Sequence, residues 1–354
     1  MAPKIKLKFP RINPEDCLSD RSSTSEDRKT NLFGEGKMKR VVLAVLISIV
    51  VIDCGAKAGA IVAWGYNGAG QISNAPTGTD FTSVTAGGWA AYGLRTDGSI
   101  TAWGDDTYGQ VTNTPTGTGF TAIAAGRYTA YALRSDGSIV AWGDDRYGQV
   151  SNTPTGTGYT AIVGGNTSTH AYALQTDGSI IGWGDDTYGQ VTNTPTGTGF
   201  TAISVGGGTG FALRPNGSIA SWGYDFEENI VSNTPTDTGF TAITGSFRAA
   251  YALRSDGSIY AWGDDEARAV SDTPTDTGFT AIAGAAGSGY ALRADGSIAA
   301  WGSTRAEVTD TPTAMGFTAI SAGYWNGYAL TPIPEPATVS LLALGGLALL
   351  RKRK

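Results

Sequence analysis

The sequence predicts an all-β fold, a seven-bladed β-propeller of four-stranded antiparallel blades, and three observations lead to this prediction. A segment of about 39 residues repeats along the chain, and a Trp-Gly pair marks each copy, at Trp64, Trp103, Trp142, Trp183, Trp222, Trp262 and Trp301. Each copy holds short runs of aromatic and β-branched residues, and no window has the apolar period of a helix. Sheets this small must stack on their neighbours to bury their faces, and radial stacking of four-stranded sheets gives a propeller.

One copy, residues 120–158, shows the four expected strands in order. Residues 120–124, 131–134 and 139–142 are strong candidates, and residues 149–151 are a weaker fourth. The second and third runs are joined by Ser135-Asp136-Gly137-Ser138. Asp-Gly between two such runs predicts a tight hairpin, because glycine adopts positive φ without penalty.

The repeats begin and end in the middle of a unit. Residues 60–64 are the second half of one copy, and residues 328–330 lie in the first half of another. We therefore expect residues 60–331 to form one ring, closed by two strands from each end. Closure removes exposed sheet edges, and its entropic cost grows only logarithmically with chain length.

The repeat resembles those of the regulator-of-chromosome-condensation superfamily. The motifs that carry the resemblance are Tyr131-Ala132-Leu133, Asp136-Gly137, Trp142-Gly143 and Gly148-Gln149. The short period is most similar to the bacterial branch typified by β-lactamase-inhibitor protein II. This resemblance implies a seven-bladed propeller and, by analogy, a protein partner. A histidine that often precedes the Ala-Leu strand in that family occurs here only as His170.

The N-terminal region carries targeting features. Residues 1–37 are polar, and we interpret them as a disordered leader or as a mis-assigned start, with translation beginning at Met38. Residues 38–60 are predicted to be a secretory signal peptide, since a basic start precedes the apolar run 41–52 and small-x-small cleavage sites.

The C-terminal residues 332–354 form a second motif. Pro334-Glu335-Pro336 precedes an apolar run, residues 337–350, and the basic end Arg351, Lys352, Arg353 and Lys354. This tail resembles the PEP-CTERM sorting signal of exopolysaccharide-producing bacteria, which implies recognition by an exosortase and export to the cell envelope or matrix of a Gram-negative-type bacterium. A stable membrane span needs about 20 apolar residues, so we expect a transient hold with the basic end in the cytoplasm. Whether the tail is cleaved stays open.

Composition excludes several functions. Residues 60–331 contain 10 arginines, no lysine and 23 acidic residues, a formal net charge of −13, which repels nucleic acid. His170 is the only histidine, and both cysteines lie outside the domain. Sites that need a Ser–His, Cys–His or lysine nucleophile, or zinc ligands of Cys and His, are therefore excluded there. We expect a protein that is not an enzyme.

Paired carboxylates follow the Trp-Gly motif in four copies. They are Asp105, Asp106, Asp144, Asp145, Asp185, Asp186, Asp264 and Asp265. Such pairs could serve as acid and base in a glycosidase or bind calcium. The favoured interpretation is that each pair caps a tight turn, since a structural repeat places one pair at a fixed position in each unit. We expect no cofactor, with calcium as the alternative.

The segment between the first two strands varies most among the copies. It supplies the predicted binding residues Trp89, Arg127, Tyr128, His170, Phe247, Arg248, Tyr324 and Trp325. Variable aromatic and arginine residues on a rigid scaffold are typical of binding loops, although drift of unconstrained loops is the alternative.

Strand direction places these loops and the Asp pairs on one face, and the hairpins and the chain's exit on the other. The sequence thus predicts an exported platform that binds a protein or a glycan, with its binding face pointing away from the membrane. A carbohydrate-active enzyme that uses an Asp pair and a purely structural coat protein remain as alternatives.

Overall fold

The computed structural model describes residues 58–225, 229–265 and 267–332, and these residues confirm the all-β prediction. One short helix, α2 (Ala306–Thr309), interrupts the strands. The predicted leader, the signal peptide up to residue 57 and the sorting tail from residue 333 lie outside the described residues. In the described part of the chain, no helix has the length and apolar character needed to cross a membrane.

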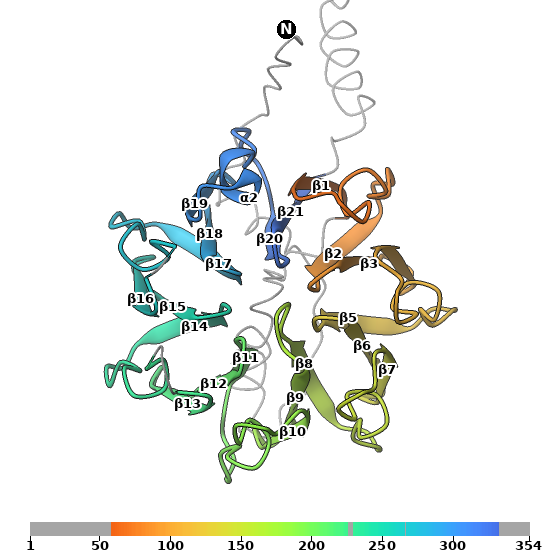
Figure 1. Cartoon of the computed structure of the whole chain (residues 1–354), viewed down its shortest axis with the longest axis horizontal. Helices are drawn as coiled ribbons and strands as arrows, with labels where there is room; N and C mark the ends of the chain where they lie inside the picture. The colour runs from red at the N-terminus through yellow and green to blue at the C-terminus, as the bar shows by residue number, and fades with distance from the viewer. Residues whose placement is uncertain (1–57, 226–228, 266, 333–354) are drawn as a thin grey trace, which may run out of the picture.

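The described strands form small antiparallel sheets that stand around a central axis, and in each three-stranded sheet the first strand lies nearest to it (Figure 1). Five sheets hold three consecutive strands each: β5 (Phe120–Ala125), β6 (Thr129–Arg134), β7 (Ile139–Gly143); β8 (Tyr159–Gly164), β9 (His170–Gln175), β10 (Ile180–Gly184); β11 (Ala202–Val205), β12 (Thr209–Leu213), β13 (Ile219–Gly223); β14 (Phe240–Gly245), β15 (Ala249–Arg254), β16 (Ile259–Gly263); β17 (Phe279–Ala285), β18 (Ser288–Arg293), β19 (Ile298–Gly302).

The remaining sheet brings together strands from both ends of the chain. Its order is β20 (Ala319–Ala322), β21 (Asn326–Pro332), β1 (Gly59–Gly65), β2 (Phe81–Ala86), β3 (Ala90–Arg95), β4 (Ile100–Gly104). The strands β1 and β21 are paired along their whole length, from Gly59 opposite Pro332 to Gly65 opposite Asn326. A single bridge between Gly59 and Phe81 links β1 to β2. This sheet therefore joins two strands from the C-terminal end, β20 and β21, to four from the N-terminal end, β1 to β4, instead of the expected blade of two strands from each end.

The predicted fourth strand is absent from the repeat unit as the structure describes it. Residues 149–151 lie in a series of turns instead. The carboxylate of Asp145 accepts hydrogen bonds of 2.8 Å from the main-chain N–H groups of both Val150 and Ser151. Because a β-ladder would need these donors, the side chain of Asp145 holds the segment in a turn.

Buried aromatic side chains join each sheet to the next. Tyr92 lies edge-on to Trp142 of the following sheet, with ring centroids 5.7 Å apart. The main-chain oxygen of Gln110 accepts hydrogen bonds from both, at 3.0 Å from the Tyr92 hydroxyl and 2.9 Å from Trp142 Nε1. Fully burying a large side chain of this kind contributes about 1.5–3 kcal/mol, and an edge-to-face pair adds about 0.5–1.5 kcal/mol.

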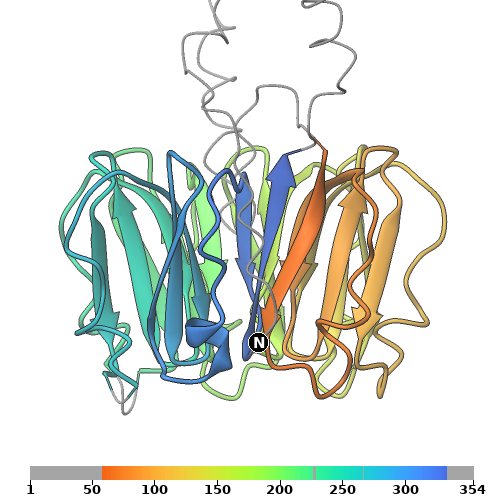
Figure 2. The same ribbon diagram turned by 90° about the horizontal axis from the view of Figure 1, so that it is seen from above.

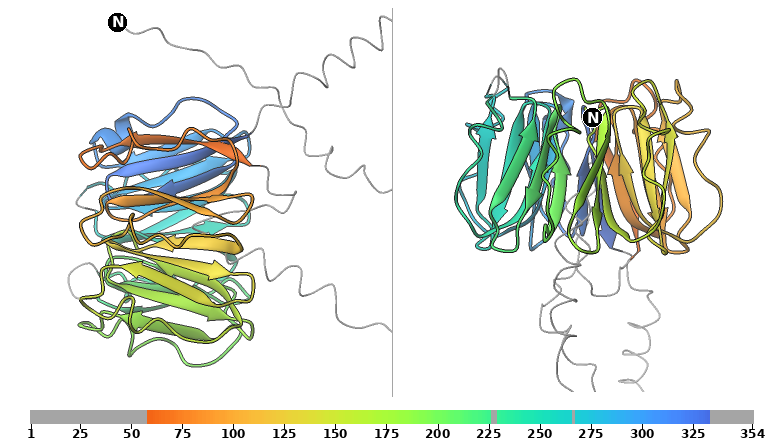
Figure 3. Two further views of the ribbon diagram at one scale, coloured as in Figure 1. Left: turned by 90° about the vertical axis from the view of Figure 1, so that its right-hand side faces the viewer. Right: turned by 90° about the horizontal axis from the view of Figure 1, so that it is seen from below.

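The strands run from one face of the disc to the other (Figures 2 and 3). One face, called the hairpin face, carries the Asp-Gly turns. The other, called the loop face, carries the loops between first and second strands and the turns after the third strands, together with α2. Phe81 begins β2 and therefore lies at the hairpin face. Because Gly59 pairs with both Phe81 and Pro332, the two ends of the described domain lie on the hairpin face as well.

Candidate functional site

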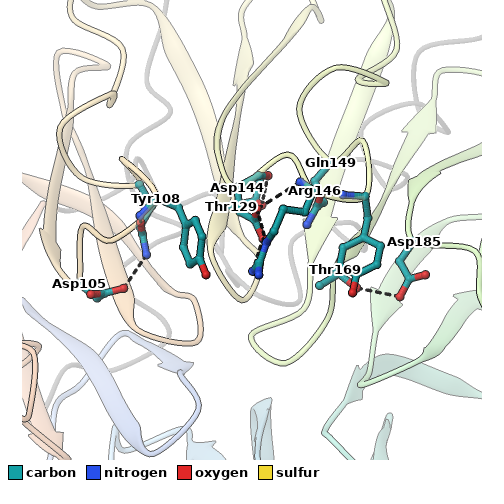
Figure 4. Close-up of polar contacts among 10 residues, drawn as sticks. Asp105, Tyr108, Thr129, Asp144, Arg146, Gln149, Thr169 and Asp185 are labelled. Atoms are coloured by element: carbon teal, nitrogen blue, oxygen red, sulfur yellow. Dashed lines mark hydrogen bonds and ion pairs between the residues drawn. The ribbon is translucent and has the colours of Figure 1, made fainter.

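The loop face brings the predicted binding loops and the Asp pairs together. Arg146, in the turn after β7, lies over the rings of Tyr108 and Tyr128, with its guanidinium carbon 4.5 and 6.0 Å from the ring centroids. Tyr128 belongs to the loop between β5 and β6, and Tyr108 follows β4. Residues from two adjacent units therefore meet on this face (Figure 4).

The second residue of each Asp pair holds a turn. The carboxylate of Asp106 accepts hydrogen bonds from the N–H groups of Val111 and Thr112, at 2.8 and 2.9 Å, and from the Thr112 hydroxyl. These bonds, foremost that from the Thr112 hydroxyl, lower the pKa of Asp106 below its usual value. Asn67 makes the equivalent contacts to Ile72 and Ser73 in the first unit. A neutral amide oxygen is thus sufficient at this position.

The first residue of each pair is also hydrogen-bonded to its surroundings. Asp144 forms a bidentate ion pair with Arg146, with contacts of 2.8 to 3.0 Å (Figure 4). Asp185 accepts a hydrogen bond from the Thr169 hydroxyl, and Asp105 accepts one from Gln110 Nε2. Among residues 58–225, 229–265 and 267–332, no group of three His, Cys, Asp or Glu side chains is placed to hold a metal ion. These contacts are those of turn-capping residues.

An aromatic cluster, called the junction cluster, lies where the two chain ends meet. It consists of Tyr66, Trp89, Tyr324 and Trp325. Trp325 is edge-on to Tyr66, Trp89 and Tyr324, at centroid distances of 5.6, 5.6 and 4.7 Å. The guanidinium carbon of Arg305 lies over the Trp325 ring at 5.2 Å. The structure therefore brings the predicted residues Trp89, Tyr324 and Trp325 together.

A second aromatic cluster consists of Tyr108 and Tyr128, whose ring centroids are 5.0 Å apart. Arg127 lies over Tyr128 at 5.2 Å, next to Arg146. The predicted pair Arg127 and Tyr128 is thus close to the turn after β7, since Arg146 of that turn lies over the Tyr128 ring at 6.0 Å.

Exposed aromatic side chains extend this surface. Tyr147 and Tyr188 are 51% and 56% exposed, and both lie in turns of the loop face. Tyr188 also contacts Tyr224, with ring centroids 4.7 Å apart. Phe247, one of the predicted binding residues, is 41% exposed and lies beneath the guanidinium of Arg248 at 5.3 Å. Large apolar rings in contact with solvent favour an interaction surface.

His170 does not lie in a loop, contrary to the prediction. It is the first residue of β9, is only 1% exposed, and lies against the ring of Tyr172 at 5.2 Å. Neither ring nitrogen has a hydrogen-bond partner in the described structure, and burial lowers the pKa of His170 to about 4. The prediction was wrong because His170 occupies the position at which the second strand begins in other units, as Thr129 and Thr209 do, and the two extra residues of its unit lie in the loop before it.

A groove opens on the loop face between the loops of the last units. Its volume is about 570 Å³, and its lining includes Phe247, Arg248, Arg268, Arg305 and Trp325. The sequence analysis did not identify Arg268 and Arg305 as candidates. The sequence nevertheless marks these two arginines, since the last two units replace the repeated Asp-Asp-Thr-Tyr-Gly turn with Asp-Asp-Glu-Ala-Arg and Ser-Thr-Arg.

Arg146, Tyr66 and Tyr224 are further residues of this face that the sequence analysis did not select. Arg146 replaces a threonine of the repeat, and Tyr66 and Tyr224 follow Trp-Gly directly where most units have aspartate. Departures from the internal repeat were therefore the available signal. These three residues lie outside the loops between first and second strands, from which the predicted binding residues come.

The fold is that of a repeat-built β protein whose small antiparallel sheets surround an axis and gather their variable loops on one face. A family model of the regulator of chromosome condensation (RCC1) repeat matches residues 81–110 and 120–149, and a model of the PEP-CTERM protein-sorting motif matches residues 332–354. The chain carries repeats of this type and the sorting motif, and both resemblances are confirmed. The closer similarity to the β-lactamase-inhibitor branch stays a prediction.

Solved structures with the same fold have low sequence identity. Prp20p from Saccharomyces cerevisiae is 14% identical with a TM-score of 0.64, over 90% of this chain and 100% of that chain. The receptor kinase CR4 ectodomain from Physcomitrella patens is 21% identical with a TM-score of 0.60, over 71% and 69%. Human WBSCR16 is 13% identical with a TM-score of 0.63, over 78% and 99%. No curated protein matches the sequence. These identities show a shared fold alone.

The PEP-CTERM motif has consequences for location. It indicates an exported protein associated with the cell envelope of a Gram-negative-type bacterium, and it implies processing by an exosortase. The motif residues Pro334, Glu335 and Pro336 and the basic end lie outside the described residues.

Proposed function

We propose that the chain forms a seven-bladed propeller whose closing blade consists of β20, β21 and β1. The six-stranded sheet then counts as two blades joined by the single bridge to Phe81. The edge contacts between blades support this count, because Tyr290 meets Trp64 at 5.7 Å and Tyr328 meets Trp103 at 5.9 Å. These two contacts repeat, across the chain ends, the contact that Tyr92 makes with Trp142 elsewhere in the fold.

The propeller acts as a non-enzymatic platform that binds an extracellular protein or glycan through its loop face. The observation that carries this proposal is the concentration of exposed aromatic rings on one face, including Tyr66, Tyr147, Tyr188 and Phe247. A rigid ring with variable loops at one end suits recognition. Prp20p, whose binding properties to Gsp1p and histones are described with its structure, offers a fold-level analogy only.

The sorting tail would orient this face. Pro332 ends β21 on the hairpin face, and Asn326 begins it at the loop face. A strand of this length spans roughly 20 Å at about 3.3 Å per residue. A domain held through the residues that follow Pro332 would therefore present its loop face away from the membrane. The charge of −13 on residues 60–331 makes a nucleic-acid partner unfavourable.

The test is capture of partners from the extracellular matrix by the exported protein. Replacing Tyr147 and Tyr188 together by serine is expected to abolish capture without a change in melting temperature, because both rings are half exposed. Tyr260→Ser is the matched control, since Tyr260 is 40% exposed on the outer strand β16, away from the loop face. Equal capture by all three proteins would refute the loop face as the binding surface.

The enzyme alternative is tested separately. Asp144 and Asp145 are replaced together by asparagine, and turnover of matrix polysaccharide is measured. The proposal expects no turnover by either protein. Turnover by the wild type that disappears in a correctly folded variant would instead establish a carbohydrate-active enzyme. A purely structural coat protein would capture no specific partner in the first experiment.

A further inference from the structure

We infer that the groove on the loop face, lined by Phe247, Arg248, Arg268, Arg305 and Trp325, binds an anionic sugar chain whose charge is carried by carboxylates. This inference rests on the proposed binding function and names its ligand class. The groove lies between the loops that join β14 to β15 and β20 to β21, the tight turn that joins β17 to β18, and the turns that follow β16 and β19.

The first argument is charge. The domain is strongly acidic, yet three of its ten arginines line this one groove, against one described carboxylate in the lining, that of Asp264. Arg248 lies 3.4 Å from Asp264, and Arg268 forms an ion pair with Asp272 at 2.9 Å. Arg305 makes no ion pair with any described residue and lies over Trp325. Among the described lining residues, Arg305 is thus the arginine whose charge no carboxylate offsets, and together with the two paired guanidinium groups it can attract an anion.

The second argument is the backbone at Arg268. Its φ is +57°, in the left-handed region that residues other than glycine avoid. The corresponding turn positions in four other units are Gly70, Gly109, Gly148 and Gly189, with φ between +74° and +79°. Asn229, a residue that tolerates this region, takes the position in a fifth unit at +49°. The backbone at Arg268 is therefore strained, and strained backbone conformations are concentrated at functional sites.

The third argument is shape. A volume of about 570 Å³ lies in the range of small-ligand sites, about 300–1,000 Å³. The lining residues lie in loops and at strand ends, so no strand edge runs along the groove for a peptide backbone to extend. Aromatic rings offer apolar surface to the C–H groups of a sugar ring, and guanidinium forks match carboxylates. Together these features favour a carboxylated sugar chain over a peptide.

The experiment is calorimetric titration of the exported protein with oligogalacturonate, and with a neutral malto-oligosaccharide of the same length. We expect binding of the oligogalacturonate alone, and weaker binding as salt increases. Arg305→Gln and Arg268→Gly are each expected to weaken binding about tenfold, the effect of losing one charge-assisted hydrogen bond. Arg268→Gly restores the residue of the other units, so its loss of affinity would not reflect a loss of folding.

Arg134→Gln is the matched control, since Arg134 ends β6 on the hairpin face and lies over the ring of Phe120. Its removal lowers the net charge of the domain equally and is expected to leave the affinity unchanged. A uniform loss of affinity in all three variants would show attraction by net charge alone and would overturn the groove. Equal binding of both sugars, no binding of either, or tighter binding of a polyglutamate peptide would overturn the ligand class.

The inference about the groove can be tested independently of the proposed function of the loop face. If oligogalacturonate fails to bind while Tyr147→Ser/Tyr188→Ser still abolishes capture of a matrix partner, the inference about the groove alone is wrong. If capture is also unaffected, the loop-face function is wrong as well.

Discussion

The indole Nε1 of Trp64 donates a hydrogen bond of 3.0 Å to the main-chain oxygen of Glu307, 243 residues further along the chain. The hydroxyl of Tyr290 donates to the same oxygen at 2.6 Å. This arrangement reproduces the contact of Trp142 and Tyr92 with the oxygen of Gln110, where the partners are close in sequence. The chain ends are therefore joined by the same interaction that joins neighbouring sheets.

Trp64→Phe tests this joint. The variant loses one buried hydrogen bond and part of the ring volume, so we expect a loss of about 2–3 kcal/mol in the free energy of unfolding, measured by denaturant titration. Trp142→Phe removes the matched contact between adjacent sheets and is expected to cause a similar loss. A Trp64→Phe protein as stable as the wild type would show that the chain ends are not held by this contact.

Asn166 holds the loop face across the central axis. Its side-chain amide donates to the main-chain oxygens of Gly284, Ala322 and Gly323, at 3.0 to 3.1 Å. Asn166→Ala removes the buried donor that these main-chain oxygens share, so we expect a loss of about 1–3 kcal/mol in unfolding free energy. Asn152→Ala, at an exposed turn, is the control and should change stability by less than about 0.5 kcal/mol. Equal effects of the two substitutions would contradict the role of Asn166.

His170 predicts a pH dependence of stability. Its folded pKa of about 4 lies below the ordinary 6.5 because it is buried, so the unfolded chain binds more protons between these values. Stability should therefore be full above pH 6.5 and fall as the pH drops toward 4, by up to roughly 3 kcal/mol at about 1.4 kcal/mol per pH unit.

The measurement is the unfolding free energy between pH 7 and pH 4 for wild type and His170→Thr. Threonine occupies the equivalent position at Thr129 and Thr209, so the variant should fold and lose the steep part of this dependence. Identical pH profiles for the two proteins would exclude His170 as the source.

Arg268→Gly should stabilise the domain. Glycine adopts the observed φ of +57° without the penalty of about 1–2 kcal/mol that other residues carry. Part of this gain is offset, because a glycine increases the conformational entropy of the unfolded chain. The lost ion pair with Asp272 is exposed and contributes little. We expect a net gain of about 0.5–1 kcal/mol in thermal or denaturant unfolding. The reciprocal change Gly148→Arg should destabilise by at least as much, and a stable Gly148→Arg protein would argue against strain at Arg268.

Asp145→Asn separates turn capping from calcium binding. Because Asn67 makes the same hydrogen bonds, we expect the asparagine variant to match the wild type, whereas Asp145→Ala should lose about 1 kcal/mol. The melting temperatures of all three proteins, measured with calcium and with a chelator, are expected not to depend on the metal. A wild-type melting temperature that rises with calcium, and an Asp145→Asn protein that does not respond, would establish a metal site.

The sequence by itself determined the all-β class, the repeat unit, the hairpins and the grouping of loops on one face. These features follow from local chemistry: the Asp-Gly turns, the alternation of short apolar runs, and the fixed position of Trp142 and its equivalents within each unit. Strand direction then places Tyr128 and Asp144 at the same end of a sheet without any knowledge of tertiary packing.

Only the tertiary structure decided the features that depend on competition between partners or on residues far apart in sequence. The segment after Asp145 forms turns because that carboxylate takes the N–H groups that a fourth strand would need. His170 is buried because it begins β9, at the position that Thr129 and Thr209 occupy in other units, and lies against the ring of Tyr172. The groove exists because Phe247, Arg305 and Trp325 come from three different units, and only the stacking of those units brings their side chains to one surface.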